Sequence, residues 1–156
     1  MLGLGAAKPV TGQAEDVVNC QITKAFEFVA YQFFDNYPRW CPQVVDLEPL
    51  SSLPVGVGCK GRQVTRDRGI DSESTFEVTQ FEDPRKLEIK GSTEPFRSSY
   101  EFHRESDNST RVSFTFELEE LELVMRPFQK LIRVALQDGA TQTIENIKKL
   151  LEEQPA

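Results

Sequence analysis

The central part of the chain reads STFEVTQFEDPRKLEIKGSTEPFRSSYEFHRESDNSTRVSFTFEL (residues 74–118). Apolar and polar residues alternate within it in short runs at 74–81, 86–92, 96–103 and 111–118. This period of two is typical of strands with one buried face and one face in water. Strands so close together can be joined only by hairpins, so the stretch predicts an antiparallel sheet.

The alternation also predicts which side chains share the dry face of the sheet. They are Phe76, Val78, Leu87, Ile89, Phe96, Ser98, Tyr100, Phe102, Val112, Phe114, Phe116 and Leu118. The opposite face carries mainly charged side chains, among them Glu77, Glu88, Lys90, Arg97, Glu101, Arg111 and Glu117. An antiparallel sheet with this pattern is covered on one side only.

The chain upstream of this stretch predicts further strands and two short helices. The strand-like runs are 16–23, 44–50 and 59–65. After Thr23, which can cap a helix, apolar residues recur at helical spacing. These apolar residues are Phe26, Val29, Ala30 and Phe33. Pro38 and Pro42 then limit the following segment to a second short helix or turn.

The cover of the dry face is predicted to be a long C-terminal helix from Pro127 to about Glu152. Apolar residues keep helical spacing there over about seven turns. They are Phe128, Leu131, Ile132, Ala135, Ile144, Ile147, Leu150 and Leu151. Gly139 interrupts this helix at a cost of about 1 kcal/mol relative to Ala. Either a strand or ligand passes close to its backbone, or the glycine is simply tolerated.

Composition narrows the classes of function. The chain has 156 residues and a formal net charge of −7, so its average surface repels phosphate backbones and anionic lipids. Its aromatic residues are mostly Phe, which suggests a large dry interior. No apolar run approaches the roughly 20 residues of a membrane-spanning helix. We expect no nucleic-acid partner, no integral membrane segment, a flexible tail over residues 1–14 and one domain over 15–153.

Catalytic and metal chemistry find little support among the residues. His103 is the sole histidine, and the strand register places it on the wet face beside Glu101. Cys20, Cys41 and Cys59 lack a paired spacing, which favours reduced thiols and a cytoplasmic location. Gly56–Gly58 reads as a turn, because no helix N-terminus follows it to hold a phosphate. We therefore predict no catalytic residue, no metal site and no cofactor.

Two side chains allow two interpretations each. Around Arg62 neither alternate set is clearly apolar, so Arg62 faces either solvent or the interior, where it would pair with an anionic group on a ligand. Trp40 either wedges the short helices onto the core or lies at a cavity rim, where it would stack on a ligand. Tyr100 and Ser98 lie on the dry face, where a hydroxyl needs a partner: backbone, Gln80 or a ligand.

The order of predicted elements resembles the helix-grip fold of the START, Bet v 1 and polyketide cyclase/dehydrase (SRPBCC) superfamily. The likeness to the polyketide cyclase/dehydrase-like branch covers nearly the whole chain from about Asp16 onward. It rests on DNYPRWCPQV (35–44), VGVG (55–58), EDP (82–84), STRV (109–112) and IKKLLE (147–152). These patterns mark the fold and no reaction. The resemblance implies an α+β fold with a curved antiparallel sheet of about six to seven strands, two short helices and a long C-terminal helix.

The resemblance further implies a cavity between sheet and helix for a lipid, polyketide or quinone-like molecule. The residues expected to line it come from the dry face, the short helices and the long helix. They are Trp40, Arg62, Val64, Phe76, Val78, Leu87, Ile89, Ser98, Tyr100, Phe102, Phe114, Phe128, Ile132 and Ala135. The same Phe-rich rows could instead interlock as a solid core, and the sequence does not separate these cases.

Three functions remain open from the sequence. The first is binding or transport of a hydrophobic small molecule. The second is a polyketide cyclase or dehydratase that uses Tyr100 or an inward Arg. The third is a protein-interaction module that uses the acidic stretch 117–122 as its contact. The oligomeric state is not readable from the sequence.

Overall fold

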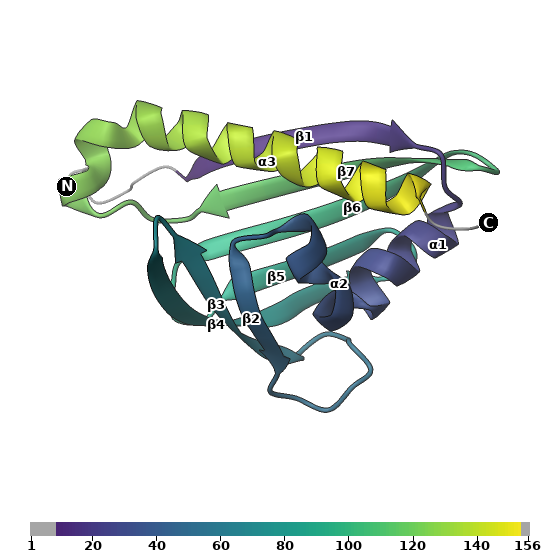
Figure 1. Ribbon diagram of the computed structural model, residues 1–156, viewed down its shortest axis with the longest axis horizontal. Coiled ribbons are helices and arrows are strands. Elements are labelled where there is room, and N and C mark those ends of the chain that lie inside the picture. The colour runs from purple at the N-terminus through teal and green to yellow at the C-terminus, as the bar shows by residue number, and fades with distance from the viewer. Residues whose placement is uncertain (1–8, 154–156) are drawn as a thin grey trace, which may run out of the picture.

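The computed structural model of the chain describes residues 9–153. Seven antiparallel strands form one curved sheet in the order β1-β7-β6-β5-β4-β3-β2. The long helix α3 (Gln129–Glu152) crosses the concave side of the sheet, and two shorter helices close one end of it (Figure 1). This is the predicted helix-grip α+β architecture.

All strands but the first lie close to their predicted positions, and the first shares only residues 16–18 with the predicted run 16–23. Their bounds are β1 (Val10–Val18), β2 (Val44–Pro49), β3 (Lys60–Asp67), β4 (Ile70–Glu82), β5 (Lys86–Gly91), β6 (Phe96–Ser106) and β7 (Ser109–Leu118). Each strand from β2 to β6 pairs with the next one along the chain, and β1 pairs with β7. The hairpins predicted from the turn signals are therefore present.

The helices differ slightly from the prediction. Helix α1 (Ile22–Phe26) continues through the π-helical turn η2 (Glu27–Tyr31), and α2 (Phe33–Trp40) follows. Helix α2 accommodates Pro38 and ends before Pro42. A 3-10 segment, η3 (Leu123–Phe128), precedes α3, so Pro127 lies just outside the long helix.

The register confirms the two predicted faces of the sheet. Tyr100 lies opposite Phe114 on one side and Leu87 on the other, and all three side chains are buried. Arg97, opposite Glu117 and Lys90, belongs to the convex face. Glu88 also faces the convex side but is buried. It accepts hydrogen bonds from Thr79, Gln80 and Ser99 at 2.8–3.3 Å, which offsets the desolvation of its carboxylate.

The N-terminal boundary lies earlier than the sequence predicts. Strand β1 begins at Val10, so residues 10–14 belong to the sheet and not to a flexible tail. The remainder of the predicted tail, except Pro9, lies outside the described residues. The inward positions Gly12 and Ala14 are small, because the backbone of α3 passes directly over Gly12. A strand with small inward residues shows no apolar alternation, which is why the sequence pattern misses it.

Only the second half of α3 packs as predicted. Its buried residues are Ala140, Ile144, Ile147 and Leu151. In the first half, Phe128 just before the helix and Leu131 and Ala135 within it are exposed, and Ile132 is half-buried. The expectation that this half also covers the dry face is therefore wrong. No helix among residues 9–153 combines the length and apolar content needed to cross a membrane.

Candidate functional site

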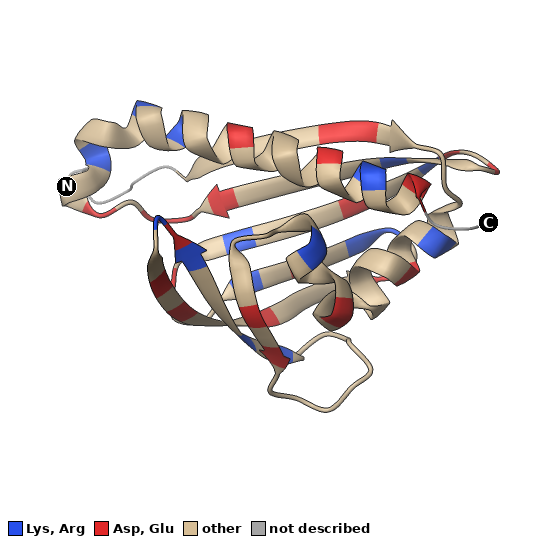
Figure 2. Cartoon of the chain, viewed as in Figure 1, with Lys and Arg blue, Asp and Glu red and all other residues tan. Residues whose placement is uncertain are grey.

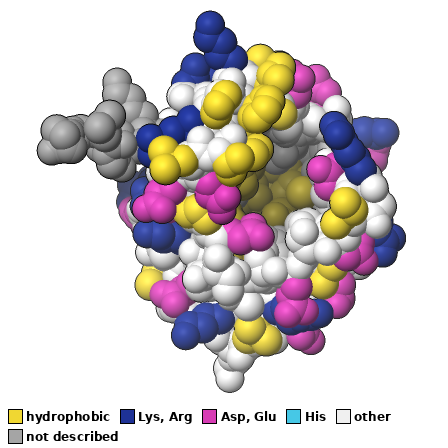
Figure 3. Space-filling model, turned by 90° about the vertical axis from the view of Figure 1, so that its left-hand side faces the viewer, with side chains coloured by type: hydrophobic (Ala, Val, Ile, Leu, Met, Phe, Trp, Pro, Cys, Tyr) yellow, Lys and Arg dark blue, Asp and Glu magenta, His cyan; other side chains and the backbone are white. Residues whose placement is uncertain are grey.

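The molecule is hollowed at the end where β7 stops and α3 starts. Figure 3 views this end and shows a recess with hydrophobic side chains on its floor and around part of its rim. The backbone elements at this end are the end of β7 and the first half of α3 (Figure 1). Apolar surface in a recess of this kind is the usual chemistry of a site for small hydrophobic ligands.

The position of α3 explains why space remains. The helix packs on β1 and β7 at one edge of the sheet and reaches α2 near its far end. At Gly12 a Cβ atom would overlap the carbonyl oxygen of Leu136, so strand and helix backbones are in direct contact there. The Gln137 side chain fixes this crossing, accepting from the Gln13 N–H at 3.1 Å and donating to the Gln13 carbonyl at 2.6 Å. The first half of α3 therefore lies over an edge strand and leaves the middle strands uncovered.

Several inner-face apolar side chains at this end keep part of their surface accessible. Phe116 and Leu118 of β7 are half-buried, although their register places them on the concave face beside Ser98 and Phe96. Phe96 and Phe116 stack with ring centroids 5.8 Å apart. The sequence pattern places both phenylalanines on the dry face, but does not single them out as lining the cavity.

The opposite end of the enclosure is solid. Trp40 is 1% exposed and packs against Phe28, Phe33, Tyr37 and Tyr100 with ring centroids about 6 Å apart. Trp40 therefore occupies the wedge position between the short helices and the sheet, and not the rim. Its indole Nε1–H donates to the Tyr100 hydroxyl at 3.3 Å. Trp40 is not among the partners for Tyr100 expected from the sequence. The expected partner Gln80 lies on the convex face, where it hydrogen-bonds to Glu88.

Burial makes the Tyr100 phenol a weaker acid than an ordinary tyrosine. Desolvation raises the pKa of the Tyr100 phenol above its ordinary value, although the hydrogen bond from Trp40 acts in the opposite direction. The phenol is therefore protonated at neutral pH. It can donate a proton or a hydrogen bond, but it cannot act as a base.

A buried polar pair lies on the concave face where β3 meets β4. Gln63 lies opposite Ser74, and its Nε2 donates to the Ser74 hydroxyl at 3.2 Å. The Gln63 Oε1 atom is buried without a hydrogen-bond partner among the described residues. No signal in the sequence indicates this pair, since neither alternate set of β3 is clearly apolar.

Arg62 and Val64 do not belong to the concave face. They alternate with the inward Gln63, so both lie on the convex side of β3. Arg62 faces Asp46, Glu48 and Glu73, with nitrogen–oxygen distances of 3.0, 3.6 and 2.7 Å. The outward orientation is therefore the correct one, and Arg62 is occupied by carboxylates of the neighbouring strands. The inclusion of both residues in the cavity lining is wrong.

The remaining residues of the predicted lining divide into two groups. One group belongs to the continuous core cluster on the concave face: Trp40, Phe76, Val78, Leu87, Ile89, Tyr100, Phe102 and Phe114. Ser98 is also buried on this face. The second group lies on or just before the uncovered half of α3, where Phe128 and Ala135 are exposed and Ile132 is half-buried. The structure thus brings the strand residues together in one core and leaves the helix residues partly or fully accessible.

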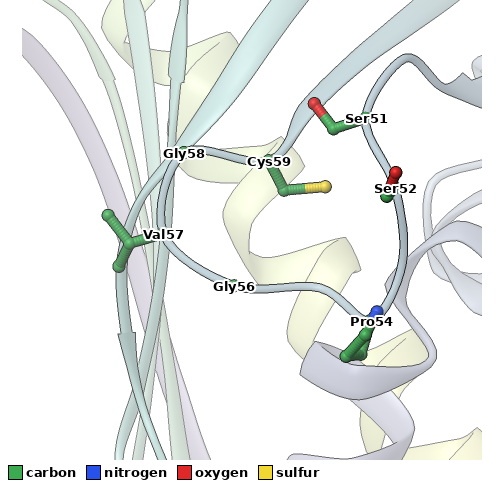
Figure 4. A pocket seen from close by; sticks show the side chains of 7 residues that line it. All are labelled: Ser51, Ser52, Pro54, Gly56, Val57, Gly58 and Cys59. Atoms are coloured by element: carbon green, nitrogen blue, oxygen red, sulfur yellow. The ribbon is translucent and has the colours of Figure 1, made fainter.

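A second, shallow pocket lies within the loop 51–59 (Figure 4). Its volume is about 230 Å³. The Cys59 side chain points toward the inside of the loop, whereas Val57 points away from it (Figure 4). Burial raises the pKa of the Cys59 thiol, so this thiol is less reactive than an ordinary one. Nothing else about this pocket indicates a site.

In residues 9–153 no group of three or more His, Cys, Asp or Glu side chains could hold a metal ion. His103 is exposed on the convex side, 4.0 Å from Glu101. In the acidic stretch 117–122, Glu119 lies 3.7 Å from both Lys90 and Arg97. Glu120 and Glu122 are exposed.

Solved structures share this fold at low sequence identity. A protein of Thermus thermophilus matches with a TM-score of 0.72 and 14% identity, covering 90% of this chain and 96% of its own. The ginseng (Panax ginseng) major latex-like protein 151 matches with a TM-score of 0.69 and 11% identity, covering 93% and 99%. The two-domain ARO/CYC protein StfQ of the steffimycin biosynthetic pathway matches with a TM-score of 0.73 and 13% identity, covering 94% of this chain and 51% of StfQ. At these identities the likeness shows the fold alone.

At the sequence level, no curated protein matches the chain. A family model does match, over residues 10–152, and it describes polyketide cyclases and dehydrases together with lipid transport proteins. The match includes every strand and helix of the described fold. The chain therefore belongs to the polyketide cyclase/dehydrase and lipid transport family.

Proposed function

We propose that the protein binds and carries a hydrophobic small molecule in the recess between the concave sheet and the first half of α3. The observation that carries this proposal is the apolar recess itself, left open because α3 crosses an edge strand. Burial of apolar ligand surface contributes about 25 cal/mol per Å², so a ligand can be held without ion pairs. A lipid, a polyketide or a quinone-like molecule would satisfy this chemistry.

Ser98 is the polar side chain that we expect a ligand in the recess to contact. It lies in one row across the sheet with Phe116 and Ile89, on the concave face. Its hydroxyl can donate and accept, so a ligand that carries one hydroxyl or carbonyl group would be oriented by it. We therefore favour a mainly apolar ligand with one polar end.

The test places a larger apolar side chain at position 98. We expect Ser98→Leu to weaken the binding of an apolar fluorescent probe, N-phenyl-1-naphthylamine, at least about 10-fold without lowering the unfolding temperature. Ser113→Leu is the matched control, because Ser113 belongs to the convex face of β7. We expect the control to bind the probe as the unaltered chain does.

Two results would count against the proposal. If neither the unaltered chain nor the control binds the probe, the recess does not take apolar ligands. If Ser98→Leu lowers the free energy of unfolding by the roughly 1–3 kcal/mol of an overpacked core, the space beside Ser98 is already filled. Native mass spectrometry of the purified chain would identify any ligand retained in the recess.

A cyclase or dehydratase is the second candidate, because the family includes such enzymes and Tyr100 is a protonated phenol on the concave face. Tyr100 would act there only as an acid or hydrogen-bond donor. The carboxylates Glu77, Glu88, Glu101 and Glu117 face the convex side and could not assist it. Incubation of Tyr100→Phe and the unaltered chain with poly-β-keto substrates tests this candidate, and identical products would remove Tyr100 from any catalytic role.

A further inference from the structure

The surface around η3 and the start of α3 is unusually apolar. We define the rim segment as residues 123–134, which comprise η3 and the first residues of α3. Its exposed large apolar side chains are Leu123, Val124, Met125, Phe128, Leu131 and Val134. Leu131 is 70% exposed and Val134 58%. Figure 3 shows hydrophobic side chains gathered beside the opening of the recess. A contiguous apolar patch of this kind indicates an interaction surface.

The rim segment is also positively charged, in contrast to the molecule as a whole. The chain carries a net charge of −7, yet residues 123–137 contain Arg126, Lys130 and Arg133 and no acidic residue. Figure 2 shows these cations together at one end of α3. Lys130 and Arg133 are exposed and form no ion pair within residues 9–153. The acidic average of the chain therefore does not describe this surface.

We propose that the rim segment docks on the surface of an anionic lipid bilayer. Helices that lie in the membrane interface combine exposed Leu, Phe and Val with Lys and Arg, which is the composition of this segment. Anionic headgroups attract the cations, while the apolar side chains enter the boundary of the hydrocarbon region. A second copy of the chain is a poorer occupant, because a two-fold contact would place Lys130 and Arg133 against cations of the same kind.

The rim segment lies beside the opening of the recess (Figure 3), so docking would bring this opening close to the bilayer. The recess opens beside it, so an apolar molecule could pass between bilayer and recess with little exposure to water (Figure 3). The docking itself does not depend on that passage. Glu120 and Glu122 are exposed just before the segment and oppose it electrostatically, so charge and apolar burial must act together.

The test is co-sedimentation of the full chain with lipid vesicles. We expect it to bind phosphatidylcholine vesicles that contain about one third phosphatidylserine more tightly than vesicles of phosphatidylcholine alone, and less tightly as salt rises. Lys130→Gln together with Arg133→Gln should weaken binding to the anionic vesicles about 25-fold, since each cation near the surface contributes about a factor of five. Leu131→Ser together with Val134→Ser should weaken the binding that remains at high salt.

The matched control is Lys24→Gln together with Lys60→Gln. Both lysines are exposed and form no ion pair within the described part of the chain, so this control changes the net charge equally. It should bind anionic vesicles as the unaltered chain does, and circular dichroism should show all variants folded. Because the substituted side chains are exposed, folding is not expected to change.

Three outcomes would overturn the proposal. In the first, the unaltered chain does not sediment with anionic vesicles at low salt. In the second, the control loses as much binding as Lys130→Gln/Arg133→Gln, so that only net charge matters. In the third, light scattering shows that the unaltered chain is a dimer and that the Leu131→Ser/Val134→Ser variant is a monomer, which would make the rim segment an interface between copies. Binding of the fluorescent probe in the recess is measured on the same variants. Because probe binding tests the carrier function and vesicle binding tests the docking, the failure of one proposal can be told from the failure of the other.

Discussion

At the scale of the residue, Tyr100 and Trp40 join the short helices to the sheet. The Trp40 Nε1–H donates to the Tyr100 hydroxyl at 3.3 Å, and both side chains are almost fully buried. A buried donor that loses its partner keeps the full cost of desolvation, whereas an exposed one regains water. Removing a tyrosine hydroxyl should therefore lower the free energy of unfolding more at a buried position than at an exposed one.

We expect Tyr100→Phe to lower the free energy of unfolding by about 1–3 kcal/mol, because the Trp40 indole is left without an acceptor. Tyr31→Phe is the control, since the Tyr31 hydroxyl donates to Asp83 at 2.6 Å on a side chain that is 42% exposed. Its loss should cost less than about 1 kcal/mol. Urea unfolding of both variants measures the difference, and equal losses would show that the buried hydrogen bond adds no stability of its own.

Two glycines show at this scale what the sequence leaves open. Gly139 either marks a close backbone approach or is simply tolerated in the helix, and the structure favours tolerance, because nothing lies within 4 Å of a Cβ built there. The close approach is at Gly12, in a segment where the sequence predicts a flexible tail. Only the crossing of α3 over β1 shows which glycine is required.

Gly12→Ala and Gly139→Ala should accordingly have opposite signs. Gly12→Ala pushes a methyl group into the Leu136 carbonyl and should destabilise the chain by about 1–3 kcal/mol. Gly139→Ala adds a methyl group in open space and should stabilise α3 by up to about 1 kcal/mol. The denaturation midpoints of the two variants test this, and a stable Gly12→Ala would contradict the direct contact between strand and helix.

At the scale of the element, α3 is one continuous helix with two different environments. Its second half buries Ala140, Ile144, Ile147 and Leu151 against the sheet, whereas no side chain before Ala140 is buried. The first half is held near β1 by the contact at Gly12 and by the Gln13–Gln137 hydrogen bonds. Stability that comes from packing must therefore differ along the helix.

Native-state hydrogen exchange should show this difference directly. We expect the backbone amides of residues 131–138 to exchange faster than those of residues 144–151, because opening the first half exposes little buried apolar surface. Mass spectrometry of peptides from the two halves measures it. Equal protection along α3 would indicate that the whole helix unfolds as one unit with the sheet.

The strands show how far a local pattern reaches at this scale. Alternation alone assigns every second residue of four segments to the dry face, and all of these residues belong to the concave face. The segments run from Phe76 to Val78, Leu87 to Ile89, Phe96 to Phe102 and Val112 to Leu118. Strand β3 is ambiguous because its inward residues include Gly61 and Gln63. Where small or polar residues point inward, alternation loses its contrast and only the pairing with β4 assigns the faces.

At the scale of the whole molecule, recess and rim segment arise from one arrangement. Helix α3 crosses the edge strand β1, so its first half leaves the central strands uncovered and its own apolar face exposed. A ligand in the recess would provide the packing that this half lacks. Binding and local stability should therefore be coupled.

A ligand that occupies the recess should raise the unfolding temperature and slow hydrogen exchange in residues 131–138. At a free ligand concentration of about 100 times Kd, the expected stabilisation is about 2.7 kcal/mol. Thermal shift assays with a panel of fatty acids, quinones and polyketide-like aromatics measure the first effect, with Ser98→Leu as the blocked control. A ligand that stabilises both chains equally binds outside the recess.

Local sequence patterns are enough to define the order of most elements, the antiparallel pairing and the dry and wet faces of most strands. These properties follow from neighbours a few residues apart, whose spacing is visible in the chain, and the resulting order of elements resembles the helix-grip fold. The assembled fold is needed to show that Arg62 and Val64 face outward, that Trp40 closes the solid end, and that the first half of α3 stands clear of the sheet. Those outcomes depend on where α3 crosses β1, a contact between Gly12 and Leu136 that lie far apart in the chain and carry no local signal.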